Sequence, residues 1–195
     1  NAFGSGNYLA VEVNTSKFNR NLVLSTTDPY FTQNGISRTI DVFHRTTRPY
    51  LTTDLSSYSL VNSGVGLRFG VPVTENDTVF MGLNAEQTQI DKGTAGNLPV
   101  EYNNYGNEFG FKSTAFPLTL GWARDGRDSA LVPTKGSLQR VNADLSLAGD
   151  VRYFRSNYQY QYYYPLSKKY NLAFNAEFGW GLGLSGQKYP LFKNF

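Results

Sequence analysis

A glycine-rich segment near the end of the chain is the first group of residues whose spacing could support chemistry. Gly181-Leu182-Gly183-Leu184-Ser185-Gly186 matches the G-x-G-x-x-G pattern of dinucleotide-binding turns. That pattern binds a pyrophosphate only where a strand precedes it and a helix follows it. Here the glycines lie in and just after a strand-like segment, and no helix pattern follows. We therefore interpret them as small residues lining a lumen or a loop, and we expect no cofactor.

His44, the only histidine, is the second candidate. Ser37 and Asp41 lie nearby in sequence, but nothing indicates the oxyanion hole that a catalytic triad also needs. The chain has no cysteine, which excludes disulfides, thiol catalysis and cysteine-bound metals. No spacing of carboxylates around His44 predicts a metal site. We interpret His44 as a rim-facing side chain near a loop, and we do not expect an enzyme.

A charged segment with turn residues is the third candidate. Its notable members are Arg124, Asp125, Arg127, Asp128, Pro133 and Gly136. One interpretation is a salt-bridged turn that fixes the register of a hairpin. The other is a contact surface for a partner protein.

Alternating strands must position all three groups. Successive strand side chains point to opposite faces, so strict alternation predicts a sheet with one apolar and one polar face. The clearest rows are Tyr158, Tyr160, Tyr162 and Tyr164, then Leu172, Phe174, Ala176, Phe178, Trp180 and Leu182. The alternation predicts about nine strands, at 6–18, 20–27, 36–45, 58–71, 78–90, 114–123 and 136–147, with two more within 151–184. Compact turns are expected at 28–35, 72–77 and 165–170, long loops at 46–57 and 91–113, and no helix anywhere.

The composition limits the class of protein. The 195 residues have a mean hydropathy of −0.40, and no run approaches the ~20 apolar residues of a membrane helix. A search for long apolar runs does not detect a transmembrane β-barrel, because half of the residues of a barrel line a polar lumen. The net charge of +3 is spread along the chain without a basic stripe, so nucleic-acid binding is not expected.

The polar face indicates which side of the sheet looks outward. Only 17% of residues are charged, against about 25% in ordinary soluble domains. Glycine, asparagine and a few opposed charges, which suit a barrel lumen, fill the polar rows. Aromatic residues near strand ends suggest interfacial girdles: Tyr8, Tyr30, Phe31, Trp122, Tyr164 and Trp180. The sequence therefore favours an all-β fold, a transmembrane antiparallel β-barrel, over a soluble barrel or sandwich.

The charged segment also carries a resemblance. With its flanking residues it resembles the strand–turn–strand segment of the BamA family, the outer-membrane insertase of the β-barrel assembly machinery. The matching positions are Asp125, Arg127, Asp128, Pro133, Thr134, Gly136 and Ser137. Three further stretches resemble the family in the same order: 27–35, 69–73 and 189–195. The last is similar to the approach to the family's long inward-folded loop.

The resemblance implies an incomplete portion of a barrel. About nine meander strands correspond to the third to eleventh of sixteen, so residues 1–195 are expected to be a partial outer-membrane β-barrel domain without POTRA repeats or closing strands. The family's Val-Arg-Gly motif is expected to follow Phe195. The rim with compact turns is expected to be periplasmic.

The resemblance also implies a function, namely part of a non-enzymatic insertase that folds and inserts β-barrel proteins into the bacterial outer membrane. The implied partners are outer-membrane lipid, nascent outer-membrane proteins, and periplasmic and lipoprotein subunits of the assembly machinery. Asp125, Arg127, Asp128, Pro133 and Gly136 would then be a structural turn or a contact for such subunits. Three alternatives stay open: a two-partner-secretion-type translocation barrel, a small outer-membrane barrel with lipid-directed enzyme activity, and a soluble β-barrel or sandwich that binds a ligand.

Overall fold

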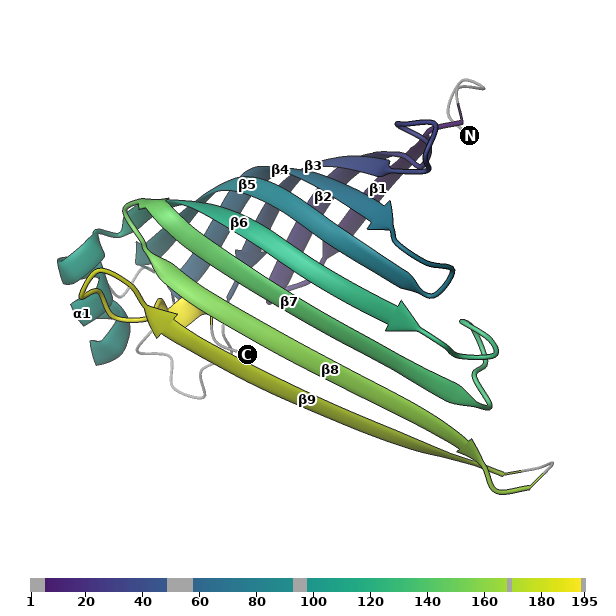
Figure 1. Ribbon diagram of the computed structural model, residues 1–195. Coiled ribbons are helices and arrows are strands. Elements are labelled where there is room, and N and C mark those ends of the chain that lie inside the picture. Colours follow the sequence, from purple (N-terminus) through teal and green to yellow (C-terminus); the bar gives the residue numbers. More distant parts are fainter. Residues whose placement is uncertain (1–5, 49–57, 93–97, 168–169, 194–195) are drawn as a thin grey trace.

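The computed structural model describes residues 6–48, 58–92, 98–167 and 170–193. They form one antiparallel sheet of nine strands, each paired with the next in chain order (Figure 1). The strands are β1 (Tyr8–Thr15), β2 (Asn19–Asp28), β3 (Ser37–Thr47), β4 (Tyr58–Pro72), β5 (Asp77–Lys92), β6 (Lys112–Asp125), β7 (Gly136–Gly149), β8 (Tyr153–Pro165) and β9 (Asn171–Gly183). The expected all-β meander is confirmed.

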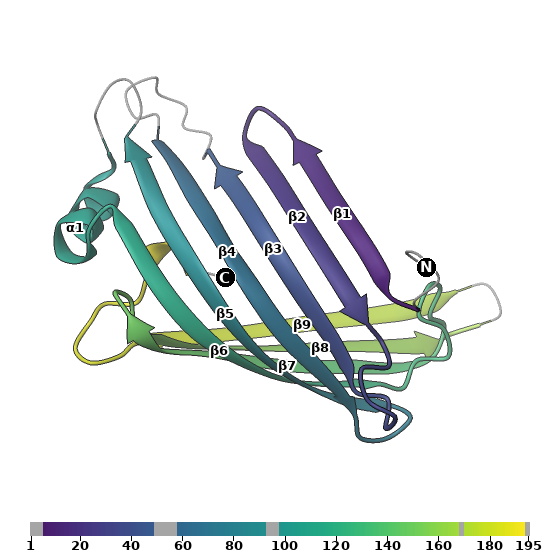
Figure 2. The same cartoon turned by 90° about the horizontal axis from the view of Figure 1, so that it is seen from above.

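The sheet is curved, with β1 and β9 at its two edges (Figure 2). Its register places apolar residues in continuous outward rows. One row runs from Leu67 on β4 through Leu83, Leu118, Leu145 and Phe154 to Leu182 on β9. Leu67 and Leu83 of this row are exposed and its other members are half-buried, and on the same face Phe178 retains 68% of its accessible surface. A large exposed apolar face marks contact with protein or membrane, as the alternation predicted.

The polar faces of the same strands point inward. Gly66 and Arg68 alternate with the outward Leu67, and Thr119 lies in register with Asp144 and Gly82. Tyr8, expected in an aromatic girdle, lies in register with Thr27, whose hydroxyl bonds to Thr39 on the inner face. Its side chain therefore belongs to the inner rather than the lipid-facing side.

The connections separate into two rims. The turn rim is where β2 ends and β3 begins, and likewise for the pairs β4–β5, β6–β7 and β8–β9. The loop rim is where β1 ends and β2 begins, and likewise for β3–β4, β5–β6 and β7–β8, and it also carries the segment after β9. The alternation of short and long connections is not strict, since two very short turns lie on the loop rim. Residues 49–57 and 93–97 of the expected loops, and residues 168–169 of the expected turn at 165–170, lie outside the described residues.

A helix at the loop rim corrects the expectation that the chain has none. Residues 91–113, expected to form a loop, contain α1 (Val100–Phe109), which begins after Pro99 and ends before Gly110. Asn and Gly inside this segment lower its intrinsic helix propensity. Packing stabilises it instead, since Tyr105 is 4% exposed. Among the residues described, no helix is long and apolar enough to cross a membrane.

The buried core lies on the inner side of the sheet, near the loop rim. Its members are Ile90, Tyr105, Ala115, Val151 and Tyr153, with Leu60, Leu98, Tyr102, Phe109, Phe111, Tyr189, Leu191 and Phe192 packed around them. Strands, helix α1 and the segment after β9 all contribute to it. One end of the inner face is therefore filled, and the rest is lined mainly by polar side chains and glycines, with Phe43, Phe80 and Leu138 among them.

Candidate functional site

The segment after β9, residues 184–193, folds back onto the inner face; we call it the docked segment. Its reversal uses the left-handed conformations of Ser185 (φ 57°) and Gly186 (φ 78°), and the Gln187 amide donates to the Leu184 carbonyl at 3.1 Å. A short 3-10 helix, η2 (Leu191–Lys193), ends the described part of the segment. The G-x-G-x-x-G pattern is therefore the end of a strand and a chain reversal.

Two glycines of that pattern make room for the docked segment. A Cβ at Gly181 would lie 2.6 Å from the ring of Tyr189. A Cβ at Gly183 would collide with the backbone carbonyl of Gln187. Close approach of another backbone is a known reason for glycine within a strand. Gly181 and Gly183 are therefore small residues on the inner face, covered by the docked segment.

A buried ion pair holds the end of the docked segment. Lys193 Nζ lies 2.6 Å from Glu86 Oε1 on β5, and the two side chains are 14% and 8% exposed. The Tyr153 ring from β8 lies beside them, with its centroid 5.7 Å from Nζ and its hydroxyl 3.5 Å from Glu86 Oε1. Because both charges are largely removed from solvent, loss of one partner would leave the other unpaired.

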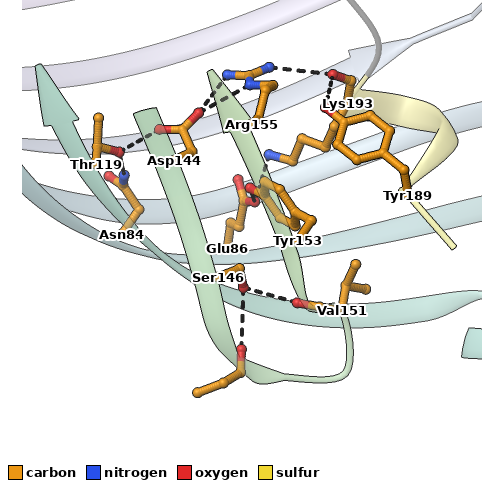
Figure 3. Close-up of polar contacts among 11 residues, drawn as sticks. Asn84, Glu86, Thr119, Asp144, Ser146, Val151, Tyr153, Arg155, Tyr189 and Lys193 are labelled. Carbon is orange, nitrogen blue, oxygen red and sulfur yellow. Dashed lines mark hydrogen bonds and ion pairs between the residues drawn. The ribbon is translucent and has the colours of Figure 1, made fainter. Parts of the chain in front are cut away.

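Arg155 on β8 connects the docked segment to a second carboxylate (Figure 3). Its guanidinium donates to Asp144 Oδ2 from Nη2 at 2.7 Å and from Nε at 3.2 Å. Its Nη1 also donates to the Lys193 carbonyl at 3.5 Å, and the Tyr189 hydroxyl donates to the same carbonyl at 2.8 Å. The backbone at Lys193 is thus held by two side chains in addition to the ion pair.

The network continues along the inner face. Asp144 Oδ1 accepts from the Thr119 hydroxyl at 2.8 Å, and Asn84 Nδ2 donates to Thr119 Oγ1 at 3.3 Å. Asp144, Thr119 and Asn84 lie on β7, β6 and β5, so the network crosses the sheet perpendicular to its strands. It fixes the inner faces of these strands relative to Arg155.

Apolar contacts complete the docking. Tyr105 of α1 packs against Phe192 of η2 at 5.3 Å between ring centroids and against Phe109 at 4.7 Å. Burial raises the pKa of the Tyr105 phenol to about 12. Helix α1 and the docked segment thus shield each other's aromatic side chains from solvent. The ion pair between Lys188 of the docked segment and Glu108 of α1 is long, at 4.0 Å, and solvated.

Sequence reasoning missed this network. Glu86 and Asp144 were visible as charges opposite apolar rows, and residues 189–195 resembled the approach to an inward-folded loop. Nothing in the sequence indicated that Lys193 reaches Glu86 or that Arg155 reaches Asp144. An acidic residue facing a lumen was the available signal, because such a charge needs a partner.

The charged turn lies between β6 and β7 on the turn rim. The Arg127 guanidinium donates to both carboxylate oxygens of Asp125, at 2.8 and 2.7 Å. Asp128 Oδ1 accepts from the amides of Thr134 and Lys135 at 2.9 and 3.1 Å, and its Oδ2 accepts from the Thr134 hydroxyl. These bonds hold the pKa of the exposed Asp128 at about 2, with the Thr134 hydroxyl the largest cause. These hydrogen bonds therefore connect the beginning of the turn, at Asp128, to its end, at Thr134 and Lys135.

The two remaining motif residues lie where that turn ends. Gly136 opens β7 with φ +105°, and a Cβ there would collide with the Gly126 carbonyl. Pro133 precedes the Thr134 amide that Asp128 binds. The same turn presents Leu131 to solvent at 93% exposure. Five motif residues thus lie in one small structure, and their contact with a partner stays a prediction.

His44 does not form a triad. It shares the outward face with Val42, whereas Asp41 lies on the inner face beside Arg68, and Ser37 donates to the Gly70 carbonyl. Its Nδ1 instead lies 2.7 Å from the hydroxyl of Ser63 on β4. Within the described ranges, no group of three or more His, Cys, Asp or Glu side chains could hold a metal ion.

A curved antiparallel meander with an exposed apolar outer face, a polar inner face and a segment folded against that inner face is part of the wall of a transmembrane β-barrel. The sequence pattern of the Omp85 superfamily domain matches residues 1–195, and the chain belongs to this superfamily. The bacterial outer membrane is its location.

Two relatives define the similarity further. The outer membrane protein assembly factor BamA of Neisseria meningitidis serogroup B is 36% identical over 206 residues, covering 100% of this chain and 26% of the relative. The crystal structure of BamA from Haemophilus ducreyi lacking POTRA domains 1–3 superimposes with a TM-score of 0.85 at 22% identity, covering 98% of this chain and 38% of that one. The resemblance to the BamA family is confirmed, and the chain spans about a quarter of its curated relative's length.

Proposed function

We propose that this chain is the barrel-wall portion of an outer-membrane insertase, which folds and inserts β-barrel proteins into the bacterial outer membrane. The observation that carries the proposal is the identity of 36% to an outer membrane protein assembly factor over the whole chain. Residues 1–195 are then part of a barrel domain, and the remaining strands of that domain complete the wall.

The geometry supports a physical role for this portion. Outward rows such as Leu67 to Leu182 face lipid, and the docked segment fills the inner side near the loop rim. Unpaired strand edges in a membrane bind incoming strands, because their N–H and C=O groups have no solvent partner in lipid. This portion of the wall holds the barrel rigid. The strand pairing itself occurs at the unpaired strand edges, where the completed barrel opens.

No bond-making chemistry is part of this role. Strand pairing and burial of apolar rows in lipid supply the free energy, so we propose a non-enzymatic protein. The one Ser–His contact on the outer face, Ser63 with His44, faces away from Asp41, the acid closest to His44 in sequence. A lipid-directed enzyme is therefore the weaker alternative.

We propose two classes of protein partner in addition to membrane lipid. Nascent outer-membrane proteins would contact the barrel as substrates. Periplasmic and lipoprotein subunits would contact the turn rim, where the hydrogen-bonded turn containing Asp125, Arg127 and Asp128 presents Leu131. A preorganised turn binds with a smaller entropy cost than a flexible one, which supports this surface as a contact.

Reconstitution of the full-length protein tests the function. Vesicles containing it would receive an unfolded reporter barrel, and folded reporter would be counted by its altered migration on unheated gels. We expect the reporter to fold in the vesicle membrane at least tenfold faster than in vesicles without the protein. Reporter delivered soluble into the vesicle interior would favour the translocation barrel instead, and unchanged folding would contradict insertase activity.

A further inference from the structure

The outer face changes from apolar to polar close to the loop rim. One outward row consists of Val11, Leu24, Val42, Val65 and Ala85. The next row toward the loop rim consists of Val13, Leu22, His44, Ser63 and Gln87, and the one after it includes Arg20 and Thr46. Hydrogen-bonding side chains thus replace most of the aliphatic ones on β3 to β5 within the same face of the sheet, with Val61 on β4 as the aliphatic exception.

We define the polar outer patch as Arg20, His44, Thr46, Ser63 and Gln87. His44 and Ser63 lie directly opposite each other, and their Nδ1 and Oγ atoms are 2.7 Å apart. Gln87 lies opposite Ser63 on the next strand, and Arg20 lies diagonally from His44 on β2. Diagonal neighbours on adjacent strands are about 7–8 Å apart, so the five side chains form a band across β2 to β5, with Arg20 and Gln87 at its two ends.

The patch is rich in hydrogen-bond donors. A Ser63 hydroxyl that donates to Nδ1 leaves the imidazole proton on Nε2, on a side chain exposed at the outer surface. The Gln87 amide and the Arg20 guanidinium, both exposed, add further donors. Glu12, Asp41 and Glu86 belong to the inner face. Asp28 and Asp77 share the outer face but lie at the turn rim, and Asp91 lies on the outer face near the loop rim. Asp91 accepts a hydrogen bond from Gln89 at 2.5 Å. The donors of the patch therefore face outward beside an apolar surface.

We propose that the polar outer patch binds the phosphate-bearing headgroup of an outer-leaflet glycolipid, with the lipid's acyl chains against Val42, Val65 and Ala85. Donors on Arg20, His44 and Gln87 match the acceptor oxygens of a phosphate ester. The loop rim carries the longer connections, which in outer-membrane barrels are extracellular, so the patch lies at the level of the outer leaflet.

Continuity with the lipid-facing rows favours a lipid over a protein as occupant. The aliphatic row and the patch share β2 to β5 and are offset by one outward position, so one amphiphile spans both. A protein partner at this position would have to displace lipid from the aliphatic row. The proposal requires only that the wall lies in the outer membrane, and insertase activity is not needed for it.

The test compares lipid binding by the full-length protein in nanodiscs. The probes are bis-phosphorylated lipid A and the same lipid A without phosphates, and bound lipid is measured by native mass spectrometry. The test variant combines Arg20→Gln, His44→Leu and Gln87→Leu. The control combines Arg38→Gln, which removes an outer-face charge at the opposite rim, with Ser156→Leu, which adds an apolar side chain to the outer face.

We expect the test variant to bind bis-phosphorylated lipid A at least tenfold more weakly than wild type, with unchanged binding of the dephosphorylated lipid. The control should bind both lipids as wild type does. Equal binding by the test variant and wild type, or equal binding of both lipids by wild type, would overturn the proposal. If the triple variant fails to fold, Arg20→Gln and Gln87→Leu are measured singly, and each should weaken the phosphorylated probe about threefold.

Discussion

Lys193 Nζ lies 2.6 Å from Glu86 Oε1, which joins the end of the docked segment to the fifth strand of the wall. Both side chains are largely buried, and the Tyr153 ring lies beside them. No other ion pair among the described residues combines two side chains this inaccessible to solvent. The first prediction follows from this pair.

Lys193→Met should release the docked segment, because removing one partner of a buried pair costs about 3–5 kcal/mol. Hydrogen exchange of residues 187–192 in the full-length protein measures the release as loss of protection. Lys188→Met is the matched control, since the Lys188 side chain is 81% exposed and its 4.0 Å pair with Glu108 should contribute little. Equal protection in both variants would contradict the role assigned to the Lys193 pair.

Gly183→Ala should weaken docking more than Gly181→Ala. The added methyl group at residue 183 would meet the backbone carbonyl of Gln187, which cannot move without displacing the segment. At residue 181 it would meet the ring of Tyr189, which can rotate away. Exchange rates of the same segment rank the two variants, and the reverse order would show that Tyr189 rather than the backbone limits the fit.

Arg155→Lys should retain charge but lose the two-pronged contact with Asp144. Lysine cannot donate from two nitrogens to a carboxylate, and it cannot also reach the Lys193 carbonyl. We expect the protection of the docked segment to fall with Arg155→Lys and to fall further with Arg155→Met. Wild-type protection in the lysine variant would mean that charge alone is sufficient.

Gly136→Ala should destabilise the turn between β6 and β7. The residue has φ +105°, and a Cβ would collide with the Gly126 carbonyl. Gly126→Ala is the control, because its Cβ would lie 3.7 Å from the nearest atom, at ordinary contact distance. Unfolding temperature of the full-length protein in detergent compares them, and only Gly136→Ala should lower it.

The hydrogen bonds of Asp128 should depend on pH only under acidic conditions. The folded-state pKa of about 2 is below the ordinary value of about 3.9, so the stabilisation is complete above pH 4 and is lost as the pH falls toward 2. The amide resonances of Thr134 and Lys135 should shift with a midpoint near pH 2. Asp128→Asn should abolish that transition, and a midpoint near pH 4 would show that the bonds do not form.

Much of the fold could be predicted from residue alternation. The rows on β8 and β9 were correct in face, and the structure adds their register, in which Tyr162 lies opposite Phe174 and Tyr164 opposite Leu172. Strand ends were less accurate: the first strand, expected at 6–18, spans Tyr8–Thr15. Local pattern determines which face a side chain occupies, whereas strand ends depend on pairing with a neighbour.

Long-range contacts explain what the sequence did not reveal. Helix α1 has the unfavourable Asn103, Asn104 and Gly106, and it is helical because Tyr105 packs against Phe192 from the far end of the chain. The His44–Ser63 contact needed only the register of β3 and β4, so a prediction of strand pairing could have found it. The Lys193–Glu86 pair needed the three-dimensional curve of the sheet.

The docking of residues 184–193 has a consequence for the order of folding. Its contacts come from Glu86 on β5, Arg155 on β8 and Gly181 on β9, so no single hairpin provides them. The surface to which the segment binds is complete only when strands β5 to β9 have paired in register. The complete set of contacts therefore requires correct pairing of those strands, and a register slip would leave Lys193 without its acceptor.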